Sequence, residues 1–251
     1  MIPARYLIII AFILGLFTLK GQDKPAISQN NGITYPDSLS GMNRLTVYVI
    51  PSKVKYDWSS PHTLYKSFIK NYTKNLFSKK NYVLGHAFVD LHPVEPDGRI
   101  FTGMRSVSKK EQKELIYKKH YGLSILGCDM AGRLESQEEL AEKIEYFAGR
   151  GQLGYIAFLI SDAAADRLAD FFREYKLSHD CDTCPEIRYG GAFYPRYHGE
   201  GAGCSAFVIS FMEIAGLLAD EFSNWLISID IPMSLIGGPY NNEQEVKLKD
   251  I

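Results

Sequence analysis

The chain has 251 residues, of which 46% are hydrophobic and 23% charged, proportions that are ordinary for a globular protein. Its 28 basic and 29 acidic residues leave a formal net charge of −1, so the composition gives no overall basic field that would attract nucleic acid. We therefore expect one domain with a sizeable core and no nucleic-acid partner.

The N-terminal segment has the pattern of an export signal. Arg5 supplies a positive charge, residues 7–17 are apolar without interruption, and Gly21 offers a small residue for cleavage. The apolar run is too short to span a bilayer comfortably, and polar sequence follows it at once. We predict a signal peptide over residues 1–21, a flexible lead-in over 22–42, and a periplasmic or extracellular protein without stable membrane insertion.

The next part of the chain predicts a strand, a helix and a hairpin. Residues 43–51 are rich in β-branched side chains and end at a proline, which is typical of a strand. Serine and proline open the segment 61–78, and apolar residues recur at every fourth position in it, which predicts a helix. Two strands, over 82–91 and 98–106, are separated by a turn rich in proline and should form a hairpin.

The second half of the chain mixes helices and strands. Ser136-Gln-Glu-Glu139 matches the capping-box pattern of a helix start, and Ser161-Asp162 is a second helix cap. The domain over 43–240 is therefore predicted to be α+β. In chain order we predict a helix over 108–119, a strand over 121–127, a helix over 136–147, a strand over 154–160, a helix after Asp162, a long loop over 177–203, a strand over 225–231 and a frayed tail over 241–251.

Cys204 opens an apolar helix directly after the small residues 201–203. The unpaired N–H groups and the dipole of a helix start favour the thiolate, which is the nucleophilic form of cysteine. Glycine at 203 leaves room for a substrate carbonyl to approach, whereas a cysteine that only fills a core needs no such neighbour. We predict Cys204 as a nucleophile, its backbone N–H as an oxyanion donor, and Gly203 as part of the substrate site.

His86 lies in the predicted strand over 82–91 and is the candidate base for this thiol. The order of the two motifs, Gly85-His86 in a strand and then a cysteine-led helix that ends near Ala215-Gly216, resembles the circularly permuted branch of the NlpC-type papain-like superfamily. That branch includes YiiX-like proteins and lecithin retinol acyltransferase relatives, and the resemblance covers roughly residues 82–218.

The resemblance implies a fold and an activity. The implied fold is papain-like, with a mainly antiparallel sheet that carries the histidine and a packed helix that carries the cysteine. The implied activity is that of a cysteine hydrolase or acyltransferase on an amide or ester, with Cys204 as nucleophile and His86 as base. Because exported relatives often act on cell-wall peptides, a peptidoglycan-type amide is the first expected substrate, with lipids and other amides behind it.

A papain-like site also needs a third polar group that orients the imidazole. In the resembling families this group lies on the next strand, and the matching position here is Thr102, where relatives have histidine or glutamate. A threonine hydroxyl stabilises an imidazolium less than a carboxylate does, and Asp90, on the same strand face as His86, is the alternative. The departure keeps a second function open, a non-catalytic or weakly active binding protein of the same fold.

The loop before Cys204 supplies further candidates. Tyr197, together with Tyr194, fits the lining of a substrate cleft, although a solvated loop would have the same composition. His198 and Glu200 are weaker candidates for a rival base. No cofactor is expected.

The other three cysteines, Cys128, Cys181 and Cys184, leave a disulfide open in an exported protein. Cys181 could pair with Cys184, or one of them with Cys128. A zinc site would need two further ligands near this pair, and only His179 lies close by, so no metal is expected.

Overall fold

The computed structural model describes residues 41–75, 85–94, 98–107, 109–128, 130–177, 188–190, 201–218 and 229–247. The predicted signal peptide, nearly all of the lead-in, and Cys181 and Cys184 lie outside these residues. Within them, no helix has the length and apolar character that crossing a bilayer requires.

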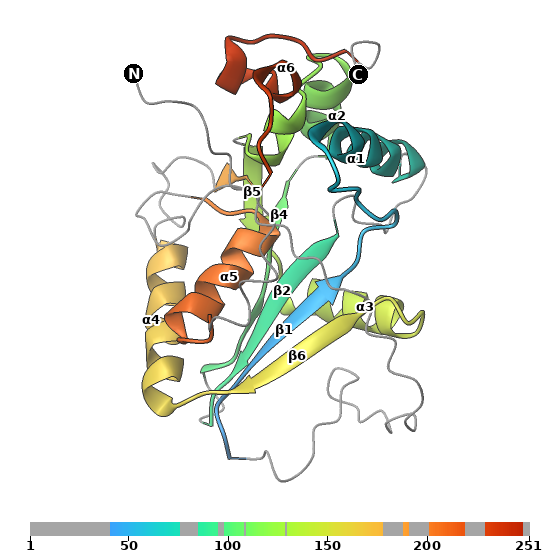
Figure 1. Ribbon diagram of the computed structural model, residues 1–251. Helices are drawn as coiled ribbons and strands as arrows, with labels where there is room; N and C mark the ends of the chain where they lie inside the picture. Colours follow the sequence, from blue (N-terminus) through green and yellow to red (C-terminus); the bar gives the residue numbers. More distant parts are fainter. Residues whose placement is uncertain are drawn as a thin grey trace.

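A four-stranded antiparallel sheet in the order β3-β2-β1-β6 forms the centre of the protein (Figure 1). Strand β1 (Arg44–Ile50) pairs with β2 (His86–His92) on one side and with β6 (Gly154–Leu159) on the other, and β3 (Ile100–Thr102) continues the sheet beyond β2. Every residue of β1 is buried, as its β-branched sequence predicts for a central strand.

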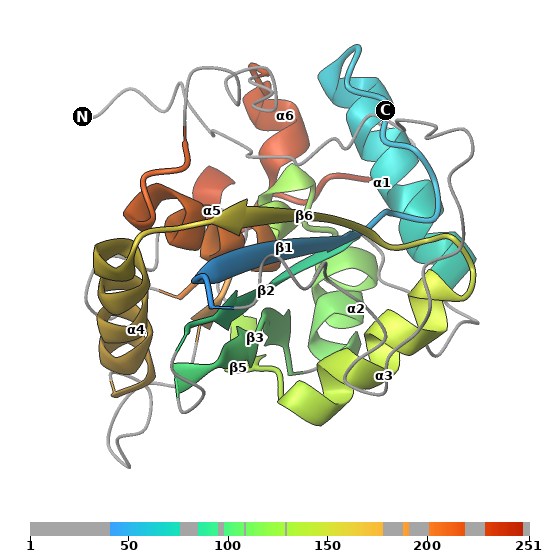
Figure 2. The same ribbon diagram turned by 90° about the horizontal axis from the view of Figure 1, so that it is seen from below.

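The alternation of side chains along β1 and β2 gives this sheet two apolar faces. One face carries Val47 and Val89, which are paired in register, and packs against α4 (Asp162–Leu177) and α5 (Cys204–Ile214). On the other face Tyr48 stacks on Phe88 with ring centroids 4.9 Å apart. This second face packs against α3 (Gln137–Ala148), so helices cover the sheet on both sides (Figures 1 and 2).

A smaller antiparallel sheet, in the order β4-β5-β7, joins the end of the central one. Above it, short helices enclose a separate apolar cluster that includes Leu64, Phe68 and Leu123. The remaining elements are β4 (Met104–Ser106), β5 (Met130–Leu134), β7 (Arg188–Tyr189), α1 (Pro61–Asn75), α2 (Lys109–Tyr117), the 3₁₀ helices η3 (Leu123–Leu126) and η5 (Pro239–Asn241), and α6 (Met233–Ile236).

The described structure is therefore α+β with antiparallel sheets, and several predicted elements are found where the sequence indicated them. The hairpin is confirmed for β2 and β3, but the predicted strand over 98–106 breaks at Gly103, where the chain passes from one sheet to the other. The predicted strand over 121–127 is wrong, because Leu123–Leu126 form a 3₁₀ helix. A short apolar run does not distinguish a strand from a buried helical turn by its pattern alone.

Two predictions near the C-terminus also need correction. Of the strand predicted over 225–231, only 229–231 are described, and they are not in a strand. The frayed tail is wrong up to residue 247, because Val246 is buried and its N–H donates to the His120 carbonyl. Contacts with an element far away in sequence hold this segment, and local composition carries no sign of them.

The start of α3 provides a test of the fold. Ser136 Oγ accepts a hydrogen bond from the Glu139 N–H, and the Glu139 carboxylate accepts one from the Ser136 N–H, so the predicted capping box is confirmed. We expect Ser136→Ala to lower the free energy of unfolding by about 1 kcal/mol, because a helix-end N–H loses its partner. Urea denaturation measures the change, and the exposed neighbour in Gln137→Ala is the matched control. Equal stabilities of the two variants would contradict the role of the cap.

Candidate active site

His86 is the first residue of β2, and the chain enters this strand through Gly85. Gly85 has φ of +80°, and a Cβ at this position would lie 2.9 Å from the carbonyl oxygen of Ile50. Only glycine accommodates both the positive φ and the close approach of the backbone. The Gly-His pair thus has a local reason, since it fixes the imidazole at one end of the central sheet.

Cys204 is the first residue of α5, and Gly203 is its N-cap in an extended conformation without a side-chain cap. The thiol is free and half-buried. The two glycines before it have different surroundings: a Cβ on Gly201 would lie 1.8 Å from the carbonyl oxygen of Arg188, in β7. Glycine at 201 is therefore required by packing against β7, whereas Gly203 directly precedes the thiol and its role in a substrate site stays a prediction.

A carboxylate joins these two residues in one buried array. The side chains of Cys204 and His86 are hydrogen-bonded to each other. Nε2 of His86 lies 2.5 Å from Oε2 of Glu135, and the two side chains are 2% and 0% exposed. The second carboxylate oxygen of Glu135 accepts a hydrogen bond from Lys143 in α3. Cys204, His86, Glu135 and Lys143 thus follow one another in a single chain of hydrogen bonds.

The charges in this array favour an ion pair between thiolate and imidazolium. Burial opposes the charged form of His86, but the Glu135 carboxylate and the hydrogen bond to Cys204 outweigh it and raise the pKa of His86 to about 9. Burial also opposes the charge of Cys204, yet the hydrogen bond and charge of His86 lower the pKa of the thiol. For Glu135, burial is outweighed by His86 and Lys143, and its pKa falls to about 2. The array therefore keeps His86 and Glu135 charged at neutral pH and shifts Cys204 toward its thiolate form.

Tyr189 in β7 is a further group at the thiol. Its hydroxyl and the Cys204 thiol are hydrogen-bonded, and its phenolic oxygen also accepts a hydrogen bond from the Cys204 backbone N–H. Burial and the neighbouring Cys204 charge raise the pKa of Tyr189 well above its usual value, so the phenol keeps its proton. The Cys204 N–H, which we expect to stabilise an oxyanion, therefore lies beside the Tyr189 hydroxyl, which is a second hydrogen-bond donor.

The predicted third residue needs correction, because the structure places Glu135 rather than Thr102 beside the imidazole. Thr102 is buried, and its hydroxyl donates to the backbone carbonyl of Glu135 at 3.2 Å. Asp90, the alternative, lies four residues along β2 from His86, about 13 Å in an extended strand. Its two carboxylate oxygens are bound by Arg99 at 2.9 and 2.8 Å.

The space for the Glu135 carboxylate comes from Gly103. A Cβ at residue 103 would lie 2.9 Å from Oε2 of Glu135 and 2.8 Å from the Cβ of Phe88. The Gly103 carbonyl also accepts a hydrogen bond from the Glu135 N–H at 2.8 Å. The strand that follows β2 thus leaves a gap beside His86, and Glu135 fills it from the second sheet.

Sequence reasoning missed Glu135, Lys143 and Tyr189. The available signal for Glu135 was a carboxylate between a predicted apolar segment and the capping box that starts at Ser136. Tyr189 lies in the segment 177–203, which we predicted to be a long loop, whereas Arg188–Tyr189 form strand β7. Tyr194, Tyr197, His198 and Glu200 from the same segment lie outside the described residues.

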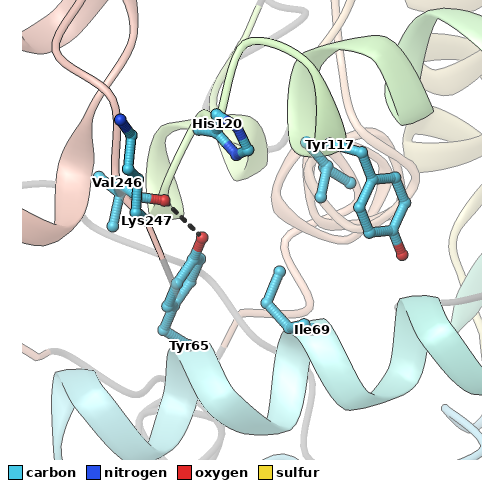
Figure 3. Close-up of a pocket in the computed structure, with 7 residues that line it drawn as sticks. Tyr65, Ile69, Tyr117, His120, Val246 and Lys247 are labelled. Carbon is cyan, nitrogen blue, oxygen red and sulfur yellow. Dashed lines mark hydrogen bonds between the residues drawn. The ribbon is translucent and has the colours of Figure 1, made fainter. Parts of the chain in front are cut away.

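Two other findings concern the described part of the chain as a whole. The described part of the chain contains no group of three or more His, Cys, Asp or Glu side chains that could hold a metal ion. A pocket of about 250 Å³ lies elsewhere, between α1, α2 and the C-terminal segment, and Tyr65, Tyr117, His120 and Lys247 are among its lining residues (Figure 3). None of the array residues lines this pocket.

Comparisons with protein-family models, with curated proteins and with solved structures found no match to this chain. The chemistry of the site is therefore argued from its own geometry. That geometry contains a polarised thiol, a base held by a buried carboxylate, and two hydrogen-bond donors next to the sulfur.

Gly103→Ala tests how Glu135 is accommodated. The new methyl group would collide with the Glu135 carboxylate and with Phe88, so we expect a loss of about 1–3 kcal/mol in the free energy of unfolding. We also expect slower alkylation of Cys204 by iodoacetamide, because a displaced carboxylate no longer holds the charge on His86. Gly149→Ala is the matched control: Gly149 has φ of −60°, which any residue adopts, and the nearest atom to its added Cβ is the Glu145 carbonyl oxygen at 3.3 Å. If Cys204 in the Gly103→Ala variant is alkylated at the wild-type rate, the gap at Gly103 does not control the effect of Glu135 on the thiol.

Proposed function

We propose that this protein is a thiol hydrolase that cleaves an amide or ester bond, with Cys204 as nucleophile and His86 as base. The observation that carries the proposal is the buried array in which His86 is hydrogen-bonded both to Cys204 and to the Glu135 carboxylate. If Cys204 and His86 only filled the core, nothing would require the buried Glu135 carboxylate that connects His86 to Lys143. The two pKa shifts that the array produces are those that activate a nucleophile.

In the proposed reaction the Cys204 thiolate attacks the substrate carbonyl carbon and forms a tetrahedral intermediate. The negative charge that develops on the carbonyl oxygen is stabilised by the Cys204 N–H, which exchanges the Tyr189 oxygen for the substrate oxygen, and by the Tyr189 hydroxyl, which the sulfur releases as its own charge passes into the new bond. The bond to the leaving group then breaks, and the His86 imidazolium donates its proton to the departing amine or alcohol. Water, deprotonated by His86, attacks the thioester, releases the acid and restores the thiol.

In this mechanism Glu135 orients the imidazole and stabilises its positive charge. The binding-protein alternative was argued from Thr102, because a hydroxyl would orient His86 poorly. A carboxylate at hydrogen-bonding distance from Nε2 removes that argument. The hydrolase is therefore the function that the geometry supports best.

The finer parts of the proposal rest on the sequence. We propose a papain-like fold of permuted topology, because the histidine strand precedes the cysteine helix in the chain and the two motifs resemble that superfamily. A cell-wall peptide amide remains the first proposed substrate. Export to the periplasm or the cell exterior is proposed from the apolar run over residues 7–17.

The roles in the array can be separated by thiol labelling. We expect Glu135→Gln to slow the alkylation of Cys204 and to reduce hydrolysis of a cell-wall peptide by about 100-fold or more, because the amide cannot stabilise the imidazolium. His86→Ala should slow the alkylation at least as much. Thr102→Val keeps the shape of a buried side chain and is the matched control, with an expected loss below about tenfold.

Labelling is followed by mass spectrometry of the Cys204 peptide, and hydrolysis by release of the amine. Equal labelling of wild type and His86→Ala would contradict activation by His86. If wild type labels rapidly but hydrolyses no wall peptide, amide or ester, the binding-protein function replaces the hydrolase.

The pH dependence of kcat/KM gives an independent check. Because the pKa of His86 is raised to about 9, the protonated imidazole is present through neutral pH and is lost as the pH rises through about 9. We expect activity to fall along that limb, since the leaving group then lacks its proton donor. In Glu135→Gln the cause of the raised pKa is removed, so the limb should move to lower pH. A limb that stays in place would mean that Glu135 does not set the charge of His86.

A further inference from the structure

Helix α1 has an outer face whose charged residues are all basic. His62, Lys66, Lys70 and Lys74 are exposed and follow each other at intervals of four residues. This spacing puts the four side chains in a row along the helix, with about 6 Å of rise between neighbours and about 18 Å in all, and the row winds around the axis by about 40° at each step. We call these four residues the basic row.

The basic row is unfavourable for α1 itself. Like charges four residues apart on a helix repel each other, and the helix carries no acidic residue that would offset them. The ion pairs found among the described residues include none with Lys66, Lys70 or Lys74. By contrast, the exposed surface of α4 carries both signs, and Arg173 there lies 2.7 Å from Asp170.

The surroundings of the row carry charges of both signs. The pocket shown in Figure 3 lies on the inner side of α1, where Tyr65 and Ile69 line it, each directly before a lysine of the row. Across the pocket Lys118 pairs with Glu114 and Lys247 with Glu245, so the positive charge of this region is concentrated on the row. Helix α1 lies at the periphery of the protein in both views (Figures 1 and 2), so the row faces outward.

We propose that the basic row of α1 binds a flexible linear polymer that carries phosphate groups. Three lysines spaced one turn apart, in a row that winds slowly around the helix, fit a flexible chain with repeated negative charges better than one compact anion. The exposed residues of α1 are His62, the three lysines and Thr73, and none of them is apolar, so the face has nothing to insert into a lipid bilayer. It also offers no aromatic side chain on which nucleic-acid bases could stack.

This inference does not rest on the proposed function, because none of its residues belongs to the array around Cys204. A variant with Cys204→Ser is therefore expected to bind the polymer as wild type does, even though it cannot hydrolyse a substrate. Loss of polymer binding and loss of hydrolysis would be separate results.

The experiment measures binding of fluorescently labelled inorganic polyphosphate to the full chain by anisotropy, between about 50 and 200 mM salt. We expect the triple variant Lys66→Gln, Lys70→Gln, Lys74→Gln to bind about tenfold or more weakly at low salt. The slope of log affinity against log salt should fall by about 2, because three phosphate contacts are lost. Circular dichroism checks that the variant is folded.

The matched control removes the same number of positive charges from α4, with Arg167→Gln, Arg173→Gln and Lys176→Gln. This control should bind within about twofold of wild type, since the effect depends on the row and not on net charge. The proposal would be overturned if both triple variants lost the same affinity for polyphosphate. It would also be overturned if the α1 variant bound polyphosphate as tightly as wild type does. Two further probes are vesicles of phosphatidylglycerol and single-stranded oligothymidine. Tighter binding to either of them than to polyphosphate at equal phosphate concentration would also overturn it, in favour of a membrane or a nucleic acid.

Discussion

The structure of the candidate site depends on one buried carboxylate. Glu135 is fully enclosed, and its two oxygens are bound by His86 and Lys143, which come from β2 and α3. A buried carboxylate is stable only while its charge is compensated, so removing either partner leaves an expensive uncompensated ion. The same contact gives His86 its charge, and His86 in turn lowers the pKa of the Cys204 thiol. Folding and chemical activation are therefore linked through Glu135.

Glu135 reaches this place because the two sheets meet at Gly103. Strand β3 ends at Thr102 and β4 begins at Met104, so the chain changes sheets within one residue. The backbone groups at this junction hold Glu135, since its N–H donates to Gly103 and its carbonyl accepts from Thr102. A side chain at residue 103 would occupy the space of the carboxylate. An acid from the second sheet thus takes the role that the neighbouring strand was expected to supply.

This arrangement explains which parts of the site the sequence could predict. His86 and Cys204 are marked by local patterns, a strand entered through glycine and an apolar helix opened by a thiol, and the structure brings them together. Glu135 lies 49 residues from His86, and Tyr189 reaches the thiol through the pairing of β7 with β5. Contacts of this kind follow from sheet register and from the junction at Gly103, which periodicity does not encode. The strand prediction for 121–127 was wrong for a related reason, because this segment packs in the apolar cluster around Leu123 and its local pattern does not encode that packing.

The net charge of the chain likewise does not predict the charge of a single surface. A net charge of −1 predicts no basic field, yet charges on separate elements do not cancel locally, and α1 concentrates one sign on its outer face. The inner face of the same helix carries Tyr72, which is close enough to raise the pKa of Tyr189. Tyr189 in turn neighbours Cys204, so the inner face of α1 borders the surroundings of the thiol, while the outer face leaves Lys66, Lys70 and Lys74 in solvent.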